Sequence, residues 1–423
     1  MRISVPYGEG ALEAVLPDGL DVTVIGPGCG LGEEVAPPVA PSAADEQAEI
    51  RRALAEPIGA PRLSELAAAA RTAAVVVSDV TRPCPSHRIL PALLEELSPL
   101  RPEQISILFA LGGHRPHSPE EQVRLVGEEV ARSGVRLLDL ETSRCRPVGT
   151  TSRGTRLEVF EPYLDADLRV CVGNIEYHYF AGFSGGAKAV VPGLCSYAAI
   201  SDNHSMMLAP TARAGIMEGN PVREDIDEAA EMIGIDFILN VLLDEEKRIW
   251  HAVAGHFLAA HRAGAEVYDR RCDLRIAEAA DVVIASPGGR PKDINLYQAQ
   301  KTLDNVSGAV KDGGVIVLVA RCPEGFGQRV FEEWMTGMGR PQVLIDRIRR
   351  EFVLGGHKAA AVAGLLDRAD VYLVSEFPDD VVRRMCMTPF SSVDEAVAAA
   401  LARAGDAARC LVVPHGSRVT AAA

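Results

Sequence analysis

Two histidines and a lone lysine lie in an apolar, glycine-rich stretch of the chain, residues 170–207. The lysine is Lys188, which follows Gly185 and Gly186, and the histidines are His178 and His204. Apolar surroundings lower the pKa of a lysine and make its amine a usable nucleophile for a covalent bond. A glycine-rich loop after a strand can also present backbone N–H groups to a phosphate. The stretch therefore indicates either covalent attachment of a group or binding of an anion.

Each of these side chains also has a simpler interpretation. Lys188 could bind phosphate or lie at a helix start, although GFSGGAK lacks the Ser or Thr that follows a Walker lysine. His204 could face solvent near a helix start, and His178 could be a hydrogen-bonded loop histidine. The residue types alone leave these alternatives open.

More polar side chains follow two apolar runs that have the pattern of buried strands. Asp79 and Arg82 follow AAVVVS, and His114 follows QISILFA. Ligands of open parallel sheets bind beyond the carboxyl ends of the strands, where these residues are expected. Arg82 could bind an anion bidentately, or it could form a structural ion pair with Asp79 at a turn. His117 completes HxxH with His114, but without a third ligand in register this metal motif is weak.

A third group of polar side chains falls on one predicted helix, NLYQAQKTLDNV. Gln298 and Lys301 are three residues apart and therefore share a helix face, and Tyr297 adjoins them. Lys301 could hold a carboxylate or a developing oxyanion, with Gln298 orienting the substrate. An exposed amphipathic helix with ordinary polar residues would show the same pattern.

These motifs, in this order, resemble those of the nickel-pincer-dependent lactate racemases. The resemblance rests on SDVTRPCP, LGGHRPHS, residues 170–207, GNPVREDIDEAA and YQAQK, and it covers roughly residues 75–305. The sequence departs from the family pattern at Gly113, where threonine is common, and at Tyr177, where proline is common. Neither departure removes a chemical group, but both could reshape the pocket.

The resemblance implies racemisation of a 2-hydroxy acid by hydride transfer, because the proton on C2 is too weakly acidic for a side-chain base. A cofactor must accept the hydride, since protein side chains cannot. In the family this is a nickel-pincer nucleotide, the Ni(II) complex of pyridinium-3-thioamide-5-thiocarboxylic acid mononucleotide, attached covalently to a lysine. Lys188 matches that lysine.

The other roles follow residue by residue from the same resemblance. His204 matches the nickel ligand, and imidazole suits nickel. His114 and His178 match a pair of acid/base histidines, one for each face of the substrate. Cofactor binding is expected of Lys188, Asp79, Arg82, Gly185 and Gly186, and substrate binding of Arg82, Tyr297, Gln298 and Lys301.

Length and composition predict an α/β protein with two domains. A chain of 423 residues is too long to fold around one hydrophobic core of ordinary size. Of these residues 48% are apolar but only 5% are aromatic, which suits layered α/β packing. We expect two doubly wound α/β domains with the active site in the cleft between them. The first would span residues 1–275, joined by the chain end 406–423 as the resemblance implies. The second, smaller domain would span residues 276–405.

Local patterns predict several elements within these domains. The first 30 residues alternate apolar and polar residues between turn residues, which is typical of short antiparallel strands. A helix is expected to begin near Ser118, where PEEQ suits a first turn, and another over residues 257–271. His357 and Lys358 follow a pair of glycines, and a helix start explains them without a catalytic role.

Charge and cysteine content narrow the partners and the compartment. A formal net charge of −15 argues against nucleic acid and an anionic membrane surface as partners, because both require clustered Lys and Arg. Nine scattered cysteines without a CxxC pair favour neither a disulfide framework nor a zinc ribbon. With no signal-peptide pattern and no membrane-spanning apolar run, we expect a cytoplasmic enzyme. Its partners would be a small 2-hydroxy acid and, transiently, the enzymes that make the cofactor.

Two alternatives to lactate racemisation stay open at the level of sequence. The substrate could be a larger or dicarboxylic hydroxy acid. The protein could also be noncatalytic and bind a nucleotide-like anion in the glycine loop as a sensor or carrier.

Overall fold

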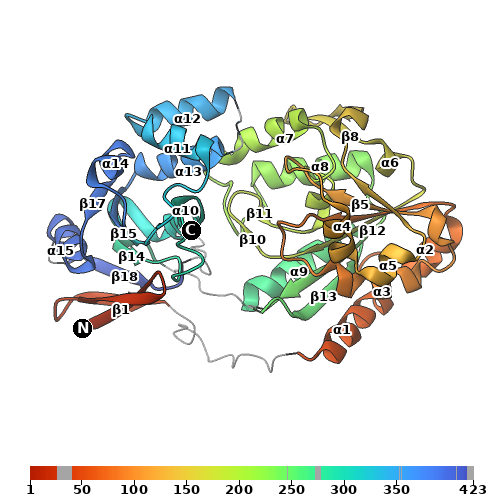
Figure 1. Ribbon diagram of the computed structural model, residues 1–423, viewed down its shortest axis with the longest axis horizontal. Coiled ribbons are helices and arrows are strands. Elements are labelled where there is room, and N and C mark those ends of the chain that lie inside the picture. Colours follow the sequence, from red (N-terminus) through yellow and green to blue (C-terminus); the bar gives the residue numbers. More distant parts are fainter. Residues whose placement is uncertain are drawn as a thin grey trace. The chain divides into compact units, whose positions relative to one another are not determined.

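The computed structural model describes residues 1–25, 41–244, 246–271, 278–351, 353, 355–405 and 407–416. The chain divides into two compact units (Figure 1), one of Val35–Arg271 and one that combines Met1–Glu34 with Cys272–Ala423. Each unit is built around a six-stranded sheet flanked by helices. This confirms the predicted class of fold, two α/β domains.

The sheet of the unit Val35–Arg271 has the strand order β13-β12-β9-β4-β5-β6. Only the edge strand β13 is antiparallel to its neighbour, and all other neighbours are parallel. The strands are β4 (Ala73–Ser78), β5 (Ile105–Ala110), β6 (Arg136–Asp139), β9 (Leu168–Asn174), β12 (Phe237–Leu243) and β13 (Ile249–Gly255).

The chain changes direction within this sheet between β4 and β9. From β4 the chain adds β5 and β6 on one side, and it then returns to add β9 and β12 on the other. The buried apolar runs of β4 and β9 suit central parallel strands that are covered on both faces. Such a reversal opens a crevice at the carboxyl ends of the two strands, which is the usual place for a ligand.

Helices and small hairpins complete this unit. The predicted helix near Ser118 begins there, because the Ser118 hydroxyl and the Glu121 side chain form a capping box. Two-stranded pairs β7–β8 and β10–β11 lie outside the main sheet. The remaining elements are α1 (Ala43–Ala55), α2 (Leu63–Ala69), α3 (Ser86–Glu96), α4 (Pro119–Val126), α5 (Glu128–Arg132), β7 (Cys145–Thr150), β8 (Arg156–Phe160), α6 (Glu161–Leu164), β10 (Tyr177–His178), β11 (Gly182–Phe183), the 3₁₀ turn η3 (Gly186–Ala189), α7 (Tyr197–His204), α8 (Pro221–Ile233) and α9 (Phe257–Arg271).

The second unit has an all-parallel sheet with the strand order β17-β16-β15-β14-β18-β3. The β1–β2 hairpin confirms two of the antiparallel strands predicted at the start of the chain, but the third, β3, is parallel to its partner β18. Its elements are β1 (Arg2–Tyr7), β2 (Gly10–Val15), β3 (Asp21–Val24), β14 (Ala280–Ala285), α10 (Leu296–Val306), β15 (Val310–Val319), α11 (Arg329–Thr336), α12 (Pro341–Arg350), α13 (Gly356–Leu366), β16 (Asp370–Val374), α14 (Asp379–Arg384), β17 (Thr388–Phe390), α15 (Val393–Ala404) and β18 (Arg409–Val413).

The structure corrects the predicted domain boundaries at both ends of the chain. β18 pairs with β14, and β3 pairs with β18, so both chain ends contribute to the second sheet. The prediction had placed residues 1–34 and the chain end 406–423 with the first domain. Strand pairing at the edge of a sheet depends on partners far away in sequence, which local patterns do not specify. Residues 417–423 lie outside the described residues.

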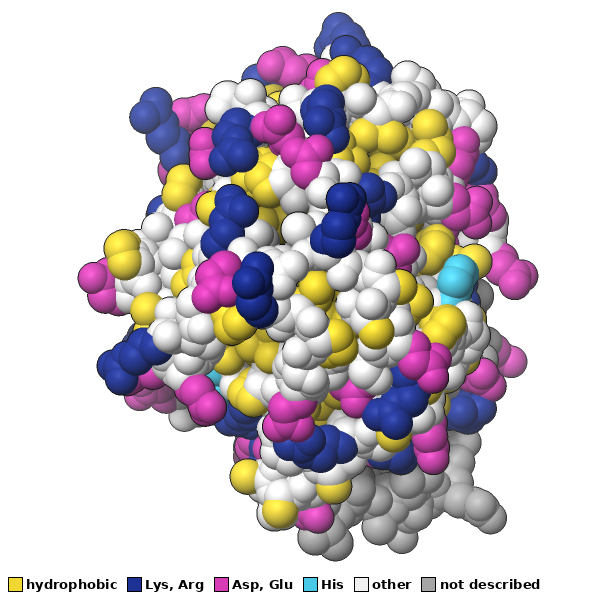
Figure 2. Space-filling view, turned by 90° about the vertical axis from the view of Figure 1, so that its right-hand side faces the viewer, with side chains coloured by type: hydrophobic (Ala, Val, Ile, Leu, Met, Phe, Trp, Pro, Cys, Tyr) yellow, Lys and Arg dark blue, Asp and Glu magenta, His cyan; other side chains and the backbone are white. Residues whose placement is uncertain are grey.

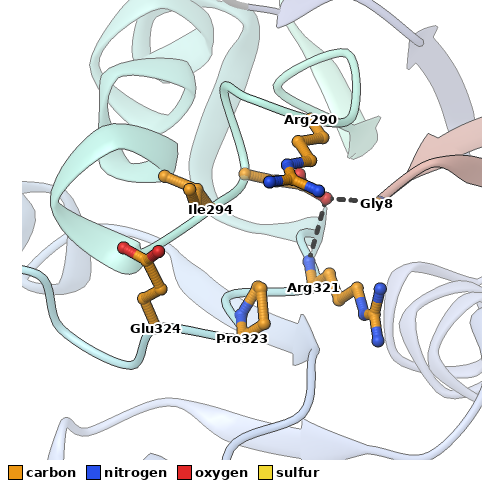
Figure 3. Close-up of a pocket in the computed structure, with 7 residues that line it drawn as sticks. Gly8, Arg290, Ile294, Arg321, Pro323 and Glu324 are labelled. Carbon is orange, nitrogen blue, oxygen red and sulfur yellow. Dashed lines mark hydrogen bonds between the residues drawn. The ribbon is translucent and has the colours of Figure 1, made fainter.

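A buried carboxylate fastens the β1–β2 hairpin to the loops of this unit. The Asp293 side chain is 1% exposed and accepts hydrogen bonds from the Gly8 N–H at 2.7 Å and the Arg321 N–H at 3.2 Å (Figure 3). A cavity of about 240 Å³ lies beside it, bordered by Arg290 and Glu324 among others. The hairpin also buries Ile3 and Val5 in the core of β14 and β15.

Charged side chains of both signs are interspersed over the face drawn in Figure 2 and are not gathered by sign. Within the part of the chain that the structure describes, no helix has the length and apolar character needed to cross a bilayer.

Candidate active site

The predicted site residues of the first unit lie just past the carboxyl ends of the strands where its strand order reverses. Asp79 and Arg82 follow β4, His114 follows β5, and His178 follows β9. Both β5 and β9 pair directly with β4. Three loops at neighbouring carboxyl ends therefore supply these side chains, as the sequence predicted.

His114 is anchored by the carboxylate of Asp79. Its Nδ1 lies 2.7 Å from Asp79 Oδ2, and the Thr81 N–H and hydroxyl donate to the other carboxylate oxygen at 2.6 and 2.5 Å. Burial acts to raise the pKa of Asp79, but the hydrogen bonds from His114 and Thr81 lower this pKa overall. The Asp79 carboxylate therefore stays ionised and holds Nδ1 of His114 as the donor. The His114 side chain is one third exposed, and its Nε2 is the nitrogen that can exchange a proton with a substrate.

Asp79 does not form an ion pair with Arg82. The Arg82 backbone N–H bonds to the Asp79 carbonyl at 3.1 Å, while the Asp79 carboxylate bonds to His114 and Thr81. The positive charge of Arg82 lowers the pKa of both His178 and Lys188, which indicates that its guanidinium lies near them. This excludes the structural ion pair at the turn and is consistent with an anion-binding role.

His178 lies in the β10–β11 hairpin and is held differently from His114. Its Nδ1 accepts the Ala181 N–H at 3.2 Å, so the neutral ring carries its proton on Nε2. Burial, followed by the charges of Lys188 and Arg82, lowers the pKa of His178 well below its ordinary value. His178 is therefore neutral at pH 7. To take up a proton it must release the Ala181 N–H or turn its ring.

Lys188 lies in the 3₁₀ turn η3, and its side chain is partly buried. Burial, and then the charges of Arg223 and Arg82, lower the pKa of Lys188 well below 10.5. A lowered pKa leaves more of the amine unprotonated and nucleophilic. The structure thus supports the property that the apolar sequence around Lys188 predicted.

The glycines before Lys188 are required by the packing of the protein itself. Gly185 and Gly186 have φ of 76° and 56°, in the left-handed region. A Cβ on Gly185 would lie 2.7 Å from Asn240 Oδ1, and one on Gly186 would lie 2.8 Å from the His261 ring. The loop is closed by Asn240, whose Oδ1 accepts the Gly186 N–H at 2.6 Å. Whether these glycines also contact a cofactor stays a prediction.

One aromatic ring, Phe180, is bordered by Lys188, His178 and His204. The ring centroid of Phe180 lies 4.6 Å from that of His178 and 4.8 Å from that of His204. The Lys188 Nζ lies 5.9 Å from the same centroid. The lysine and the two histidines therefore share one site.

A buried chain of hydrogen bonds orients His204, at the end of α7. The Asn203 Nδ2 donates to Asp225 Oδ2 at 2.7 Å, which turns the Asn203 Oδ1 toward His204 Nδ1 at 3.1 Å. Asp225 also accepts from the hydroxyls of Thr151 and Thr155. Because Oδ1 can only accept, His204 Nδ1 is the donor, and the lone pair of the neutral ring is on Nε2. This is the tautomer that a histidine ligand to a metal needs.

The segment GNPVREDIDEAA supplies residues that sequence reasoning left without a role. Arg223 is fully buried and donates to the Ala181 and Phe183 carbonyls, and Asn220 Nδ2 donates to the Phe180 carbonyl at 2.9 Å. Burial lowers the pKa of Arg223 to about 10, so it remains a cation. The sequence did contain a signal for the burial of Arg223. This arginine lies between Val222 and Ile226, on the apolar side of α8.

His261 is a second residue that the sequence did not reveal. Its Nε2–H donates to the Ser184 carbonyl at 2.8 Å, and its ring lies under Gly186. Burial, followed by the charge of Arg223, lowers the pKa of His261 well below 6.5. A single histidine in an apolar helix carries no local pattern that would identify this contact.

The predicted substrate residues Tyr297, Gln298 and Lys301 lie in the other unit, on α10. The Lys301 Nζ donates to Gln298 Oε1 at 2.8 Å, so the two side chains share a helix face as predicted. The buried Lys358, at the start of α13, places its Nζ 3.8 Å over the Tyr297 ring. Burial raises the pKa of Asp304 to about 7, against the lowering effect of Lys358 and Lys301. The predicted cleft between the domains stays a prediction.

The fold and the site define an α/β protein of two units that gathers lysine and histidine side chains near the carboxyl ends of parallel strands. Residues 7–215 match the family model described as the lactate racemase N-terminal domain, and residues 276–421 match the lactate racemase C-terminal domain. The chain belongs to the lactate racemase family and is a racemase.

Characterised relatives extend this assignment over the whole chain. A lactate racemase of Thermoanaerobacterium thermosaccharolyticum is 33% identical over 99% of this chain and 98% of its own length. A lactate racemase of Lactiplantibacillus plantarum is 35% identical over 88% of this chain and 90% of its own length.

Solved structures show the same fold. The lactate racemase apoprotein from T. thermosaccharolyticum superimposes with a TM-score of 0.85 at 32% identity, and the match covers 100% of both chains. A crystal structure of a Thermotoga maritima protein has a TM-score of 0.59 at 18% identity, over 89% of this chain and 98% of that chain. The second likeness concerns the fold alone.

Proposed function

We propose that this racemase interconverts the enantiomers of a 2-hydroxy acid, lactate or a close relative, with a nickel-pincer nucleotide bound to Lys188. The observation that supports this best is the grouping of Lys188, His178 and His204 around Phe180. The names of the two characterised relatives support lactate as the first substrate to test.

The residues present fit such a cofactor. Lys188 offers an amine with a lowered pKa, suited to a covalent link, and His204 offers an Nε2 lone pair to nickel. The family uses a metal cofactor, which when bound would supply the acceptor and donor of hydride that no side chain can replace. Arg82 and Asp79, from the neighbouring β4 loop, complete the predicted cofactor-binding set together with Gly185 and Gly186.

The two proposed acid/base histidines differ in the hydrogen bonds that their Nδ1 atoms make. His114, with Nδ1 held by ionised Asp79, can take a proton from the substrate hydroxyl at Nε2 and return it. His178 begins neutral and must exchange its hydrogen bond from Ala181 before it can accept a proton. Racemisation requires that each histidine serve one enantiomer as base and the other as acid.

Substrate orientation would require a clamp for the carboxylate. Arg82 can bind a carboxylate bidentately. Lys301, exposed on α10 and joined to Gln298, presents an ammonium and an amide side by side, with Tyr297 adjacent. We propose these four side chains as the substrate-binding set.

Mass spectrometry of the intact protein tests the attachment. We expect wild-type protein produced together with the cofactor-synthesis enzymes to carry an added mass that is absent from Lys188→Ala. The matched control Lys301→Ala should retain the adduct, because that lysine is assigned to the substrate. A wild-type protein that stays unmodified under these conditions would contradict the proposal.

The loaded protein should then be incubated with single enantiomers of lactate, larger hydroxy acids and dicarboxylic hydroxy acids. Chiral separation of the products identifies the substrate. Adduct formation without exchange of any enantiomer in the panel would contradict the proposed substrate class.

A further inference from the structure

A second histidine–aspartate pair, His117 and Asp139, is hydrogen-bonded to the loop that carries Asp79. The His117 Nδ1 is 2.7 Å from Asp139 Oδ1, and the His117 backbone N–H donates to Asp139 Oδ2 at 2.8 Å. The His117 side chain is only 1% exposed, and its ring meets the edge of Phe109 with centroids 5.0 Å apart.

The other nitrogen of the His117 ring holds the loop after β4. Its Nε2 accepts the Val80 N–H at 3.1 Å. Because Nε2 is an acceptor, the proton of the neutral ring is on Nδ1, which donates a hydrogen bond to Asp139. Asp139 thus fixes the tautomer of His117, and this tautomer lets His117 bind Val80.

Val80 directly follows Asp79, the carboxylate that holds His114. Two hydrogen bonds from Thr81 tie the Asp79 carboxylate to its own loop, and the 2.7 Å contact joins it to His114. The contacts therefore run from Asp139 through His117 and Val80 to Asp79 and His114. They link the last residue of β6 to the loops after the neighbouring strands β5 and β4.

We propose that His117, oriented by Asp139, is a positioning residue that places Asp79 against His114. The inference rests on the acid/base role proposed for His114, since it assigns to His117 the task of holding that group in position. A buried ring that only filled space would not need a hydrogen-bond acceptor aimed at a backbone N–H, nor a carboxylate to set its tautomer.

Two substitutions at His117 separate positioning from packing. In His117→Phe the ring remains against Phe109, but the acceptor for the Val80 N–H is lost. In His117→Gln the side-chain amide oxygen reaches about as far as Nε2 and can accept that N–H. Asp139→Asn keeps the shape of the partner while placing an amide donor or a weaker acceptor opposite Nδ1, and it serves if the Phe variant does not fold.

The first readout is the Nδ1–H proton of His114 in the apoprotein. It is monitored by NMR on protein with ¹⁵N-labelled histidines. Asp79→Asn and His114→Gln identify the Nδ1–H signal. We expect solvent exchange of this proton to become about 10-fold faster or more in His117→Phe and in Asp139→Asn, and to return toward the wild-type rate in His117→Gln. An unchanged signal in folded Phe and Asn variants would overturn the proposal.

The second readout is steady-state kinetics of the cofactor-loaded enzyme. We expect kcat to fall by about 10- to 100-fold in His117→Phe, with KM changed less than about 3-fold, and to recover in His117→Gln. A loaded wild type without racemase activity would contradict the proposed function, while the NMR result would still decide the role of His117. Activity in wild type with equal kcat in His117→Phe would overturn the positioning role alone.

Discussion

Lys188, the proposed attachment site, shows at the scale of one residue how an amine with a lowered pKa opposes stability. Its amine lies in a partly buried turn where desolvation and two arginines lower its pKa. Between this lowered pKa and 10.5 the unfolded chain binds a proton that the native protein does not hold, so folding is penalised. Functional residues of this kind commonly oppose stability.

We therefore expect Lys188→Met to stabilise the apoprotein. The methionine has a similar length but no charge to desolvate, and the gain should be about 1 kcal/mol, or a few degrees in Tm, at pH 7. The gain should shrink as the pH rises toward 10.5, where the unfolded lysine also loses its proton. Urea unfolding at pH 7 and pH 9.5 measures both effects.

The matched control is Lys247→Met. Lys247 lies in the same unit but is exposed, so removal of its charge should change the free energy of unfolding by less than about 0.5 kcal/mol. Equal changes in the two variants, or a less stable Lys188→Met, would contradict the expectation.

At the scale of an element, the glycine loop shows a position, Gly186, that is constrained both by its backbone conformation and by a neighbouring side chain. Gly186 has φ of 56°, and the His261 ring stands 2.8 Å from where a Cβ would be. Gly219 has a similar φ of 73°, but nothing lies within 4 Å of its Cβ position. Comparison of the two glycines separates backbone strain from steric conflict.

We expect Gly186→Ala to lower the free energy of unfolding by roughly 2–4 kcal/mol, because strain and clash add. Gly219→Ala should lower it by about 1 kcal/mol, from strain alone. The Gly186 variant should also accept less cofactor on Lys188, two residues away. Denaturant unfolding and intact mass measure the two consequences, and equal losses of stability would show that His261 imposes no constraint.

Helix α8 contributes the carboxylate that orients His204. Asp225 is fully buried and accepts hydrogen bonds from Asn203, Thr151 and Thr155, which come from α7 and the β7–β8 hairpin. Asp225→Asn retains the volume but replaces one acceptor oxygen by a donor, so one of these donors loses its partner.

We expect Asp225→Asn to cost about 2–3 kcal/mol of stability and to mix the two tautomers of His204. The His204 ring nitrogens report the tautomer by ¹⁵N NMR in the apoprotein. Glu228→Gln, on the same helix but in a more exposed bond to Ser152, should leave both stability and tautomer nearly unchanged. A single unaltered tautomer in Asp225→Asn would exclude the orienting role.

At the scale of the whole molecule, both units contain buried neutral histidines. The buried His261 and the partly buried His178, whose pKa is lowered, belong to one unit, and the buried His357, whose pKa is lowered to about 4, belongs to the other. In the unfolded chain these rings titrate near 6.5. Below that value the unfolded state binds protons that the native state does not, so stability falls as the pH falls.

We expect the apoprotein to be most stable above pH 6.5 and to lose stability from there toward pH 4. Each such histidine steepens the loss by up to about 1.4 kcal/mol per pH unit. Urea midpoints at pH 7.5, 6.0 and 5.0 check this, and His261→Gln should reduce the slope. A midpoint that does not change over this range would contradict the burial of these rings as neutral groups.

Local patterns in the sequence were sufficient for the class of fold, for most elements and for the positions of the main site residues at strand ends. Apolar runs ending in Asp79, His114 and His178 predicted three strand ends, because alternation and burial leave a local signature. Lys188 was recognisable because its apolar neighbours by themselves imply a lowered pKa.

Only the tertiary structure decided which residues support these groups. Four sets of contacts join segments distant in sequence: the pairing of β3 with β18, the hydrogen bond from Arg223 to Ala181, the position of His261 under Gly186, and the hydrogen bond from Asn203 to Asp225. Such contacts depend on how side chains pack in three dimensions. A periodic pattern along the chain does not specify this packing. For the same reason, His117 became interpretable only when its Nε2 was found against the Val80 N–H.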